Sequence, residues 1–288
     1  ALRGGVAVAQ DGQRVIAGDQ NGNVMVWDIS RADTQPILFF RGHESRIPSL
    51  DISPISNEVV TASFDRSLII WDIDGRHAEI ERLTENTSRV YASNMSADGR
   101  FIASGATNGD IIIWEAISGE VLHRIQSTAG IVYDVAFSSD STRLASAHED
   151  GTIALWDTTS GDNIRLLSDL QAPARTVVFS SDSRLIAAAG GQIQVSNARP
   201  ADNQIIIWDD DGTIVQTLNG HDAAVRTLAF TPDDEQLFSG SDDTSILSWS
   251  VETGDLIRSY QGHQDSVWSI SLNASGSQLL SGSLDNTI

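Results

Sequence analysis

Serine, histidine and aspartate occur together at two places in this chain, and they are the residue types of a hydrolytic triad. The first set is His43, Ser63, Asp65 and Trp71, and the second is His221, Ser241, Asp243 and Trp249. A serine beside a histidine and an aspartate can be activated to attack a carbonyl carbon. A catalytic site occurs once, however, whereas this set occurs twice with the same spacing. The repetition favours a structural role, and we expect no enzymatic activity and no catalytic residue.

The remaining polar residues indicate neither a metal site nor a cofactor site. His77, His123 and His148 have no metal-ligand spacing, so we take them as surface or packing residues. The acidic run 209–211, followed by Gly212, lacks the loop length and the closing glutamate of an EF-hand and is typical of a turn. The glycine-rich segments GDQNGN and GATNGD are typical of hairpin turns rather than of phosphate-binding loops. We therefore predict no metal and no cofactor.

Acidic residues dominate the charge of the chain. Its 288 residues include 39 Asp and Glu but only 18 basic residues, all of them arginine, which gives a formal net charge of −21. Nucleic-acid binding needs a basic surface, so this class of partner is disfavoured. No apolar run approaches the roughly 20 residues that cross a bilayer, so we expect no membrane association. Cysteine is absent, which favours the cytoplasm, and the start at Ala1 suggests a piece of a longer chain.

A segment ending in tryptophan recurs along the chain and sets its organisation. The six segments are NVMVWD, SLIIWD, DIIIWE, TIALWD, QIIIWD and SILSWS. Their tryptophans are Trp27, Trp71, Trp114, Trp156, Trp208 and Trp249, at spacings of 44, 43, 42, 52 and 41 residues. Short alternating strands between them are separated by DG, NG, SG and TG turns, and no helical periodicity competes with this pattern.

One repeat unit, residues 219–260, shows the expected elements clearly. Its segments AVRTLAF, QLFSGS, SILSWS and DLIRSY have the patterning of strands and are separated by turns. Four antiparallel strands in roughly 40 residues are typical of one blade of a β-propeller.

Two residue pairs that mark the repeat resemble those of the WD-repeat family. Gly-His stands at 42–43, 220–221 and 262–263, and Trp-Asp stands at 27–28, 71–72, 156–157 and 208–209. Glu115 and Ser250 replace the aspartate in two units. The resemblance covers the whole chain and implies an all-β fold, a seven-bladed WD-repeat β-propeller.

We expect a single propeller domain over 1–288 with an incomplete last blade. The predicted blades are about 1–40, 41–83, 84–125, 126–167, 168–218, 219–261 and 262–288. The last one stops at the start of its third strand, before the expected tryptophan. An exposed strand edge of this kind invites pairing with another strand.

The resemblance also assigns the two serine-histidine-aspartate sets. They resemble the structural tetrad of the family, a buried hydrogen-bond chain from the indole of Trp through Ser and His to Asp. Buried polar groups need such partners, and fully satisfied networks help to specify a fold. The third unit has lost the set, with Asn86, Ala106 and Asn108 at the corresponding positions.

The family usually binds partners on the face that carries the Gly-His loops, around the central channel. By register, the residue after the first apolar residue of each inner strand reaches this rim: Pro48, Tyr91, Tyr133, Arg175, Arg226 and Trp268. Phe64, next to a turn aspartate, and Arg46 and Arg89, beside inner strands, complete the predicted partner-binding set. Arginines and aromatics together are typical of binding hot spots.

Arginines and aromatic residues around one end of the channel predict an acidic or phosphorylated peptide with an apolar anchor as ligand, because arginine binds carboxylate and phosphate groups through two parallel hydrogen bonds. Two alternatives stay open. The aromatics can simply fill the channel wall, and Glu44, Glu149 or Asp242 can neutralise the arginines. About ten extra residues between Trp156 and Trp208 are expected on the same face, as a binding insertion or a surface bulge.

The function that follows is a non-catalytic protein-interaction scaffold that binds protein or peptide partners, with no nucleic acid and no membrane as partner. The alternatives are a small-ligand or glycan sensor, which the same aromatics would serve, and a propeller enzyme. An enzyme would need a unique cluster of ionisable residues in the channel, and the sequence shows repeated sets instead.

Overall fold

Short antiparallel β-strands make up the regular structure of the chain. The computed structural model describes residues 5–9, 11–31, 35–74, 79–192 and 203–288, and these residues form no α-helix. No helix that could cross a membrane is therefore present among them. The predicted insertion before Trp208 spans 191–203, and its residues 193–202 lie outside the described residues, as does His77.

The strands form one sheet for each repeat of the sequence. The first sheet contains β1 (Val6–Val8), β2 (Arg14–Gly18), β3 (Asn23–Asp28) and β4 (Leu38–Arg41). The second contains β5 (Ser49–Ile52), β6 (Glu58–Ala62), β7 (Leu68–Asp72) and β8 (Glu79–Leu83). The third contains β9 (Val90–Met95), β10 (Phe101–Ala106), β11 (Asp110–Glu115) and β12 (Val121–Gln126).

The later sheets repeat the same order. The fourth contains β13 (Val132–Phe137), β14 (Arg143–His148), β15 (Ile153–Asp157) and β16 (Asn163–Leu167). The fifth contains β17 (Ala174–Phe179), β18 (Leu185–Gly190), β19 (Ile205–Asp209) and β20 (Ile214–Leu218). The sixth contains β21 (Val225–Phe230), β22 (Gln236–Ser241), β23 (Ile246–Ser250) and β24 (Leu256–Tyr260), and the seventh only β25 (Val267–Leu272) and β26 (Leu279–Ser283).

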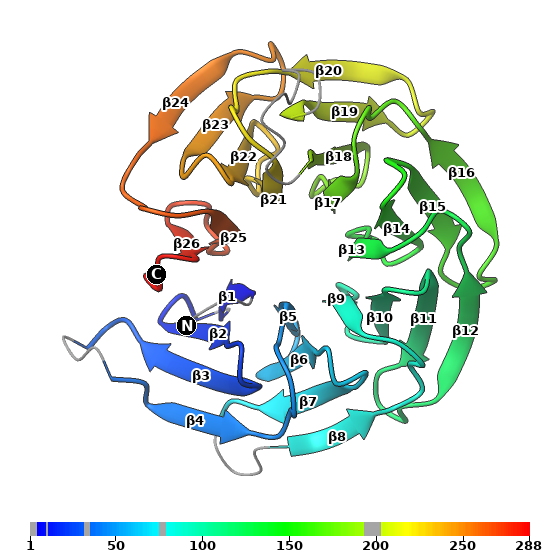
Figure 1. Ribbon diagram of the computed structural model, residues 1–288, viewed down its shortest axis with the longest axis vertical. Helices are drawn as coiled ribbons and strands as arrows, with labels where there is room; N and C mark the ends of the chain where they lie inside the picture. Colours follow the sequence, from blue (N-terminus) through cyan, green and yellow to red (C-terminus); the bar gives the residue numbers. More distant parts are fainter. Residues whose placement is uncertain (1–4, 10, 32–34, 75–78, 193–202) are drawn as a thin grey trace.

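The sheets stand radially around a central channel, with the first strand of each facing the centre and the fourth outside (Figure 1). Every sheet is a meander in which consecutive strands pair antiparallel. The predicted all-β propeller is therefore confirmed. The described residues form six complete four-stranded blades, and the seventh sheet has two strands, so the predicted count of seven blades stays a prediction.

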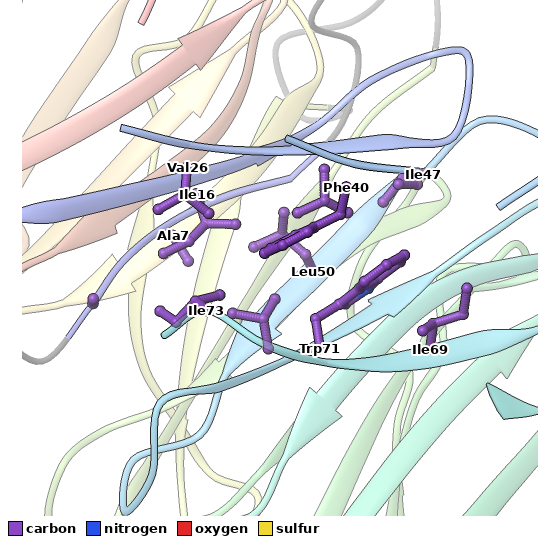
Figure 2. Packing of buried hydrophobic residues seen from close by; sticks show 12 residues of the cluster. Ala7, Ile16, Val26, Phe40, Ile47, Leu50, Ile69, Trp71 and Ile73 are labelled. Carbon is purple, nitrogen blue, oxygen red and sulfur yellow. The ribbon is translucent and has the colours of Figure 1, made fainter. Parts of the chain in front are cut away.

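Apolar side chains fill the space between neighbouring sheets. Third strands such as β7 and β15 are buried at nearly every position, because sheets pack against both of their faces. Outer strands are more exposed: in β12 every second residue faces solvent, and in β24 four consecutive residues do. Between the first two sheets, Phe40 stacks on Trp71 with ring centroids 5.6 Å apart, in a cluster that also contains Ile16 and Leu50 (Figure 2).

Glycine is required where a hairpin meets the next loop. Gly22 lies in the turn between β2 and β3 with φ of 82°, and a Cβ there would lie 2.3 Å from the carbonyl oxygen of His43. Only glycine allows both this backbone conformation and this approach. The NG turn of the first sheet is thereby packed against the Gly-His loop that leads into the second.

Candidate binding site at the mouth of the central channel

A β-bulge recurs at the start of the inner strand in the third to the seventh sheet. In the fourth sheet, Val132 pairs with His148 and Asp134 with Ala147, which leaves Tyr133 as the extra residue. The same shift leaves one extra residue in each of the other four inner strands: Tyr91, Arg175, Arg226 and Trp268. Bulges redirect a side chain away from the regular alternation. These are the residues that register alone placed at the rim.

The bulged side chains line a common cavity of about 190 Å³ in the channel. Pro48, which immediately precedes the inner strand of the second sheet, lies in the same lining. The residue that follows the rim position also lines the cavity in five of the six sheets: Ser49, Asp134, Thr176, Thr227 and Ser269. The inner strands of six sheets, the second to the seventh, therefore contribute residues to one site.

Aromatic rings and guanidinium groups contact one another around this cavity. Tyr91 packs between Phe64 and Tyr133, with ring centroids 4.9 and 5.4 Å away. Arg46 lies over both Phe64 and Trp268, at 5.6 and 4.7 Å from the ring centroids.

Three further cation–π pairs complete the group: Arg89 over Phe64 at 5.6 Å, Arg175 over Tyr133 at 3.9 Å, and Arg226 over Trp268 at 4.9 Å. With Pro48, these contacts join all nine residues predicted to bind a partner into one group, which we call the mouth cluster. Arg46, Phe64 and Arg89 flank the cavity rather than line it.

The arginines of the mouth cluster differ in their partners. Arg226 forms a bidentate pair with Asp242, with Nε 2.8 Å from Oδ1 and Nη2 2.5 Å from Oδ2. Asp242 thus neutralises this arginine, as one of the alternatives expected. Arg175 forms no ion pair within the described part of the chain, and its buried Nε has no hydrogen-bond acceptor there. Burial lowers the pKa of Arg175.

Two carboxyl groups lie deep in the channel wall. Asp51 accepts hydrogen bonds from the Nδ2 of Asn94 and the backbone N of Met95, both at 2.8 Å. Asp134 accepts one from the backbone N of Val177 at 3.0 Å. Burial raises the pKa of Asp51 to about 6 and that of Asp134 to about 7. Each carboxyl group links its own inner strand to that of the next sheet.

The serine-histidine-aspartate set of the second sheet is a structural network, but the structure corrects one of its members. The indole Nε1 of Trp71 donates to Oγ1 of Thr61 at 2.7 Å, and this oxygen lies 2.8 Å from Nε2 of His43. Nδ1 of His43 lies 2.8 Å from Oδ2 of Asp65. Ser63, the predicted link, instead donates to the carbonyl of Ser45 at 3.2 Å.

The sixth sheet repeats this correction. Trp249 donates to Oγ of Ser239 at 2.9 Å, His221 lies 2.7 Å from the same oxygen, and Ser241 donates to the carbonyl of Ala223 at 3.1 Å. The cause is cross-strand register: Trp249 pairs with Leu237, so the hydroxyl diagonal to its indole is Ser239.

These networks do not present a reactive serine. Ser239 and Thr61 are fully buried, and both hydroxyls are held by the indole and imidazole groups. Hydrogen bonds from His43 and Ser67 hold the pKa of Asp65 well below its usual range against the effect of burial. In the same way, contact with His221 lowers the pKa of Asp243 to about 2. The imidazoles are therefore locked between a hydroxyl and a carboxylate.

His148 forms a variant network that sequence reasoning missed. It is fully buried, its Nε2 lies 2.8 Å from Oγ of Ser146, and Trp156 donates to that oxygen at 2.8 Å. Burial lowers the pKa of His148 to about 4. The signal was its place two residues before Asp150, where the second and sixth units have serine. His123 lies instead on the outer strand β12, 2.8 Å from the carbonyl of Thr159.

The other units vary more. Trp208 donates to Asp169 at 2.8 Å, while the buried indole N–H of Trp114 has no acceptor among the described residues. In the seventh sheet, His263 lies 2.8 Å from Ser281 and 3.0 Å from Asp285. No group of three or more metal-ligating side chains occurs within the described ranges.

Comparison with known proteins finds the family described as "WD domain, G-beta repeat". Its profile matches residues 4–28, 34–72, 78–115, 119–157, 212–250 and 254–288. The match spans most of the chain.

The relatives of similar sequence are longer proteins that match this chain over part of their length. Autophagy-related protein 16 of Arabidopsis thaliana is 31% identical over 42% of this chain and 23% of its own length. DDB1- and CUL4-associated factor 13 of Danio rerio is 33% identical over 35% of this chain and 22% of its own length. B-type cell cycle switch protein ccs52A of Medicago truncatula is 26% identical over 85% of this chain and 50% of its own length. The matched regions thus span half or less of these proteins.

Proposed function

The chain belongs to the WD-repeat family, and on that premise we propose that it is a non-catalytic interaction module that binds a peptide or protein at the mouth of its channel. The mouth cluster carries this proposal, because it gathers arginines and aromatic rings around one cavity. Such residues supply most of the binding energy at interfaces. A relative named as a DDB1- and CUL4-associated factor is consistent with a role in assembly.

The proposed ligand is an acidic or phosphorylated peptide with an apolar anchor. Guanidinium groups stacked on rings are held in place, so a carboxylate or phosphate binds them with little loss of side-chain freedom. Tyr91, Tyr133 and Trp268 provide apolar surface beside them for the anchor. Nucleic acid and membrane surfaces, both anionic over wide areas, are disfavoured by the net charge of −21.

The size of the cavity favours a peptide side chain over a separate small molecule. Its volume of about 190 Å³ lies below the roughly 300–1,000 Å³ of sites that enclose small ligands. The glycan or small-ligand sensor is therefore the weaker alternative. A propeller enzyme is weaker still, since the serines and histidines that resemble a triad lie in buried networks.

We also propose that β25 and β26 are the inner half of a seventh blade in a single domain. The contacts of His263 with Ser281 and Asp285 repeat those of the second and sixth sheets, where a tryptophan of the third strand completes the network. The hydroxyl of Ser281 is in the position to accept such an indole N–H. The cytoplasmic location stays a prediction.

The test is a binding screen with peptide pools, followed by two double variants that each remove one arginine and one apolar side chain. Arg226→Ala with Trp268→Ala removes two members of the mouth cluster, whereas Arg258→Ala with Ile257→Ala removes an arginine and an apolar residue from the exposed outer strand β24. We expect the first to weaken a partner by a few kcal/mol and the second to leave binding unchanged. The reverse result would place the site on the outer rim.

A further inference from the structure

Neighbouring sheets present two arginines at equivalent positions with different surroundings. Arg175 and Arg226 are each the extra residue of the bulge at the start of an inner strand, and both line the channel cavity. The Nε and Nη2 edge of Arg226 is occupied by the carboxylate of Asp242. The Nε of Arg175 is buried and has no acceptor among the described residues.

The backbone explains why Arg175 lacks such a carboxylate. Asp242 follows Ser241, and Ser241 pairs with the first residue of β21. The backbone N–H of Asp242 donates to the carbonyl oxygen of Ala224. In the fifth sheet, Gly190 pairs with the first residue of β17, so the residue equivalent to Asp242 is Gly191. The backbone N–H of Gly191 likewise donates to the carbonyl oxygen of Pro173. Gly191 has φ of 142°, and a Cβ there would lie 2.6 Å from Oδ1 of Asn203. This position holds no side chain that could pair with Arg175.

We propose that Arg175 is the anion-binding residue of the channel, and that a carboxylate or phosphate of the partner pairs with its guanidinium group, the role that Asp242 has for Arg226. The proposal rests on the proposed function and names the residue that selects the ligand. Arg226, already paired, serves mainly as part of the wall against Trp268.

The surroundings of Arg175 suit a single anionic group. Its guanidinium carbon lies 3.9 Å from the ring centroid of Tyr133, and this contact holds the charged group beside the cavity. Arg226, at the same level of the cavity, adds to the unfavourable charge around Arg175, and an incoming anion relieves it. A cavity of about 190 Å³ admits one acidic side chain or one phosphate group.

The first measurement uses inorganic phosphate and acetate as probes, at constant ionic strength. Each is titrated into the protein while the arginine Nε–H resonances are followed by NMR, with Arg175 assigned from Arg175→Gln. We expect a saturable shift of the Arg175 resonance and none at Arg226. The full set of tryptophan indole resonances reports that the variant is folded.

The second measurement uses three peptide libraries that differ only at one fixed central residue: glutamate, phosphoserine or glutamine. We expect the protein to prefer an anionic library over the glutamine library by at least tenfold. Arg175→Gln should abolish this preference. Asp242→Asn should increase it, because the charge of Arg226 is then no longer neutralised by a carboxylate. Arg258→Gln, which changes the net charge equally on the outer strand β24, should leave it unchanged.

The glutamate and phosphoserine libraries show whether the partner's anionic group is a carboxylate or a phosphate. A preference that survives in Arg175→Gln overturns the proposal, and so does the absence of both an anion preference and a phosphate-induced shift at Arg175. If no library binds but phosphate shifts Arg175 saturably, the peptide-binding function fails while the anion site stands.

Discussion

Single hydroxyl groups decide how the tryptophans are held. In the second and sixth sheets, the hydroxyl that accepts the indole N–H lies two residues before the serine suggested by spacing. Ser63 and Ser241 instead accept the backbone N–H of the turn aspartate and donate to the preceding loop. Each sheet therefore uses two polar residues for two tasks, one in the core and one in the turn.

The pair Ser239→Ala and Ser241→Ala separates these tasks. Ser239→Ala leaves the buried indole of Trp249 and Nε2 of His221 without a partner, and should lower the free energy of unfolding by about 1–3 kcal/mol. It should also shift the indole N–H resonance of Trp249 in an NMR spectrum. Ser241→Ala should leave that resonance in place. A shift in Ser241→Ala alone would restore the original assignment.

His148 should make stability depend on pH in the acidic range. Its pKa in the folded protein is about 4, below the ordinary value of about 6.5, so the unfolded chain binds the proton first. The contribution of neutral His148 is therefore full above about pH 6.5 and is lost as pH falls towards 4. Denaturant unfolding between these pH values should show a smaller loss of stability for His148→Gln than for the parent.

Comparing parent and variant separates the effect of His148 from that of groups whose protonation stabilises the folded protein. The raised pKa values of Asp51 and Asp134 make stability increase as pH falls below about 7, and they act equally in both proteins. Parallel pH profiles for parent and variant would show that His148 takes up its proton equally in the folded and unfolded chain.

At the scale of elements, side chains join inner strands that no backbone ladder connects. Ser269 and Ser271 of β25 accept hydrogen bonds from the backbone N of Val6 and Val8 of β1, at 3.2 and 3.4 Å. Val6 also fills the space beside Gly282 of β26. The first and last sheets are neighbours in space, and these contacts connect the two ends of the ring (Figure 1).

Removing this connection should weaken the whole ring. Ser269→Ala combined with Ser271→Ala leaves two backbone N–H groups of β1 without acceptors, and should lower the free energy of unfolding by about 1–3 kcal/mol. Ser275→Ala, in the exposed turn before β26, is the control. Equal unfolding midpoints in urea for the double variant and the control would mean that β1 is held by packing alone.

At the scale of the whole molecule, acidic charge surrounds a small basic site. The net charge is −21, so acidic side chains repel one another across the surface, whereas the arginines of the mouth cluster are concentrated around one cavity. The two effects respond oppositely to salt, because screening relieves repulsion and also weakens attraction between the mouth and an anion.

Raising NaCl from about 0.05 to 0.5 M should therefore raise the melting temperature, since it shortens the screening length to a few ångströms. Differential scanning calorimetry measures the change. Asp222→Asn with Glu252→Gln, two exposed acids, should reduce the increase. A melting temperature that falls with salt would show that surface ion pairs, such as Arg14 with Asp74, outweigh the general repulsion.

The sequence by itself determined the repeat, the four strands of a unit and which residue of each inner strand lies at the channel rim. Tryptophan spacing and strand alternation are local properties of the chain, and the same bulge recurs at the same place in the third to the seventh sheet, so register could be counted along the sequence. For this reason the residues from Tyr91 to Trp268 that counting placed at the rim do line one cavity.

The tertiary structure decided which atoms meet. The choice of Ser239 over Ser241 depends on the cross-strand pairing of Trp249, and the entry of His148 into a network depends on the burial of its strand. The difference between Arg175 and Arg226 depends on a backbone conformation at Gly191 that leaves no side chain opposite one of them. A hydrogen bond or ion pair forms only when two atoms lie within a few ångströms of each other, and only the packing of sheets against one another fixes distances on that scale.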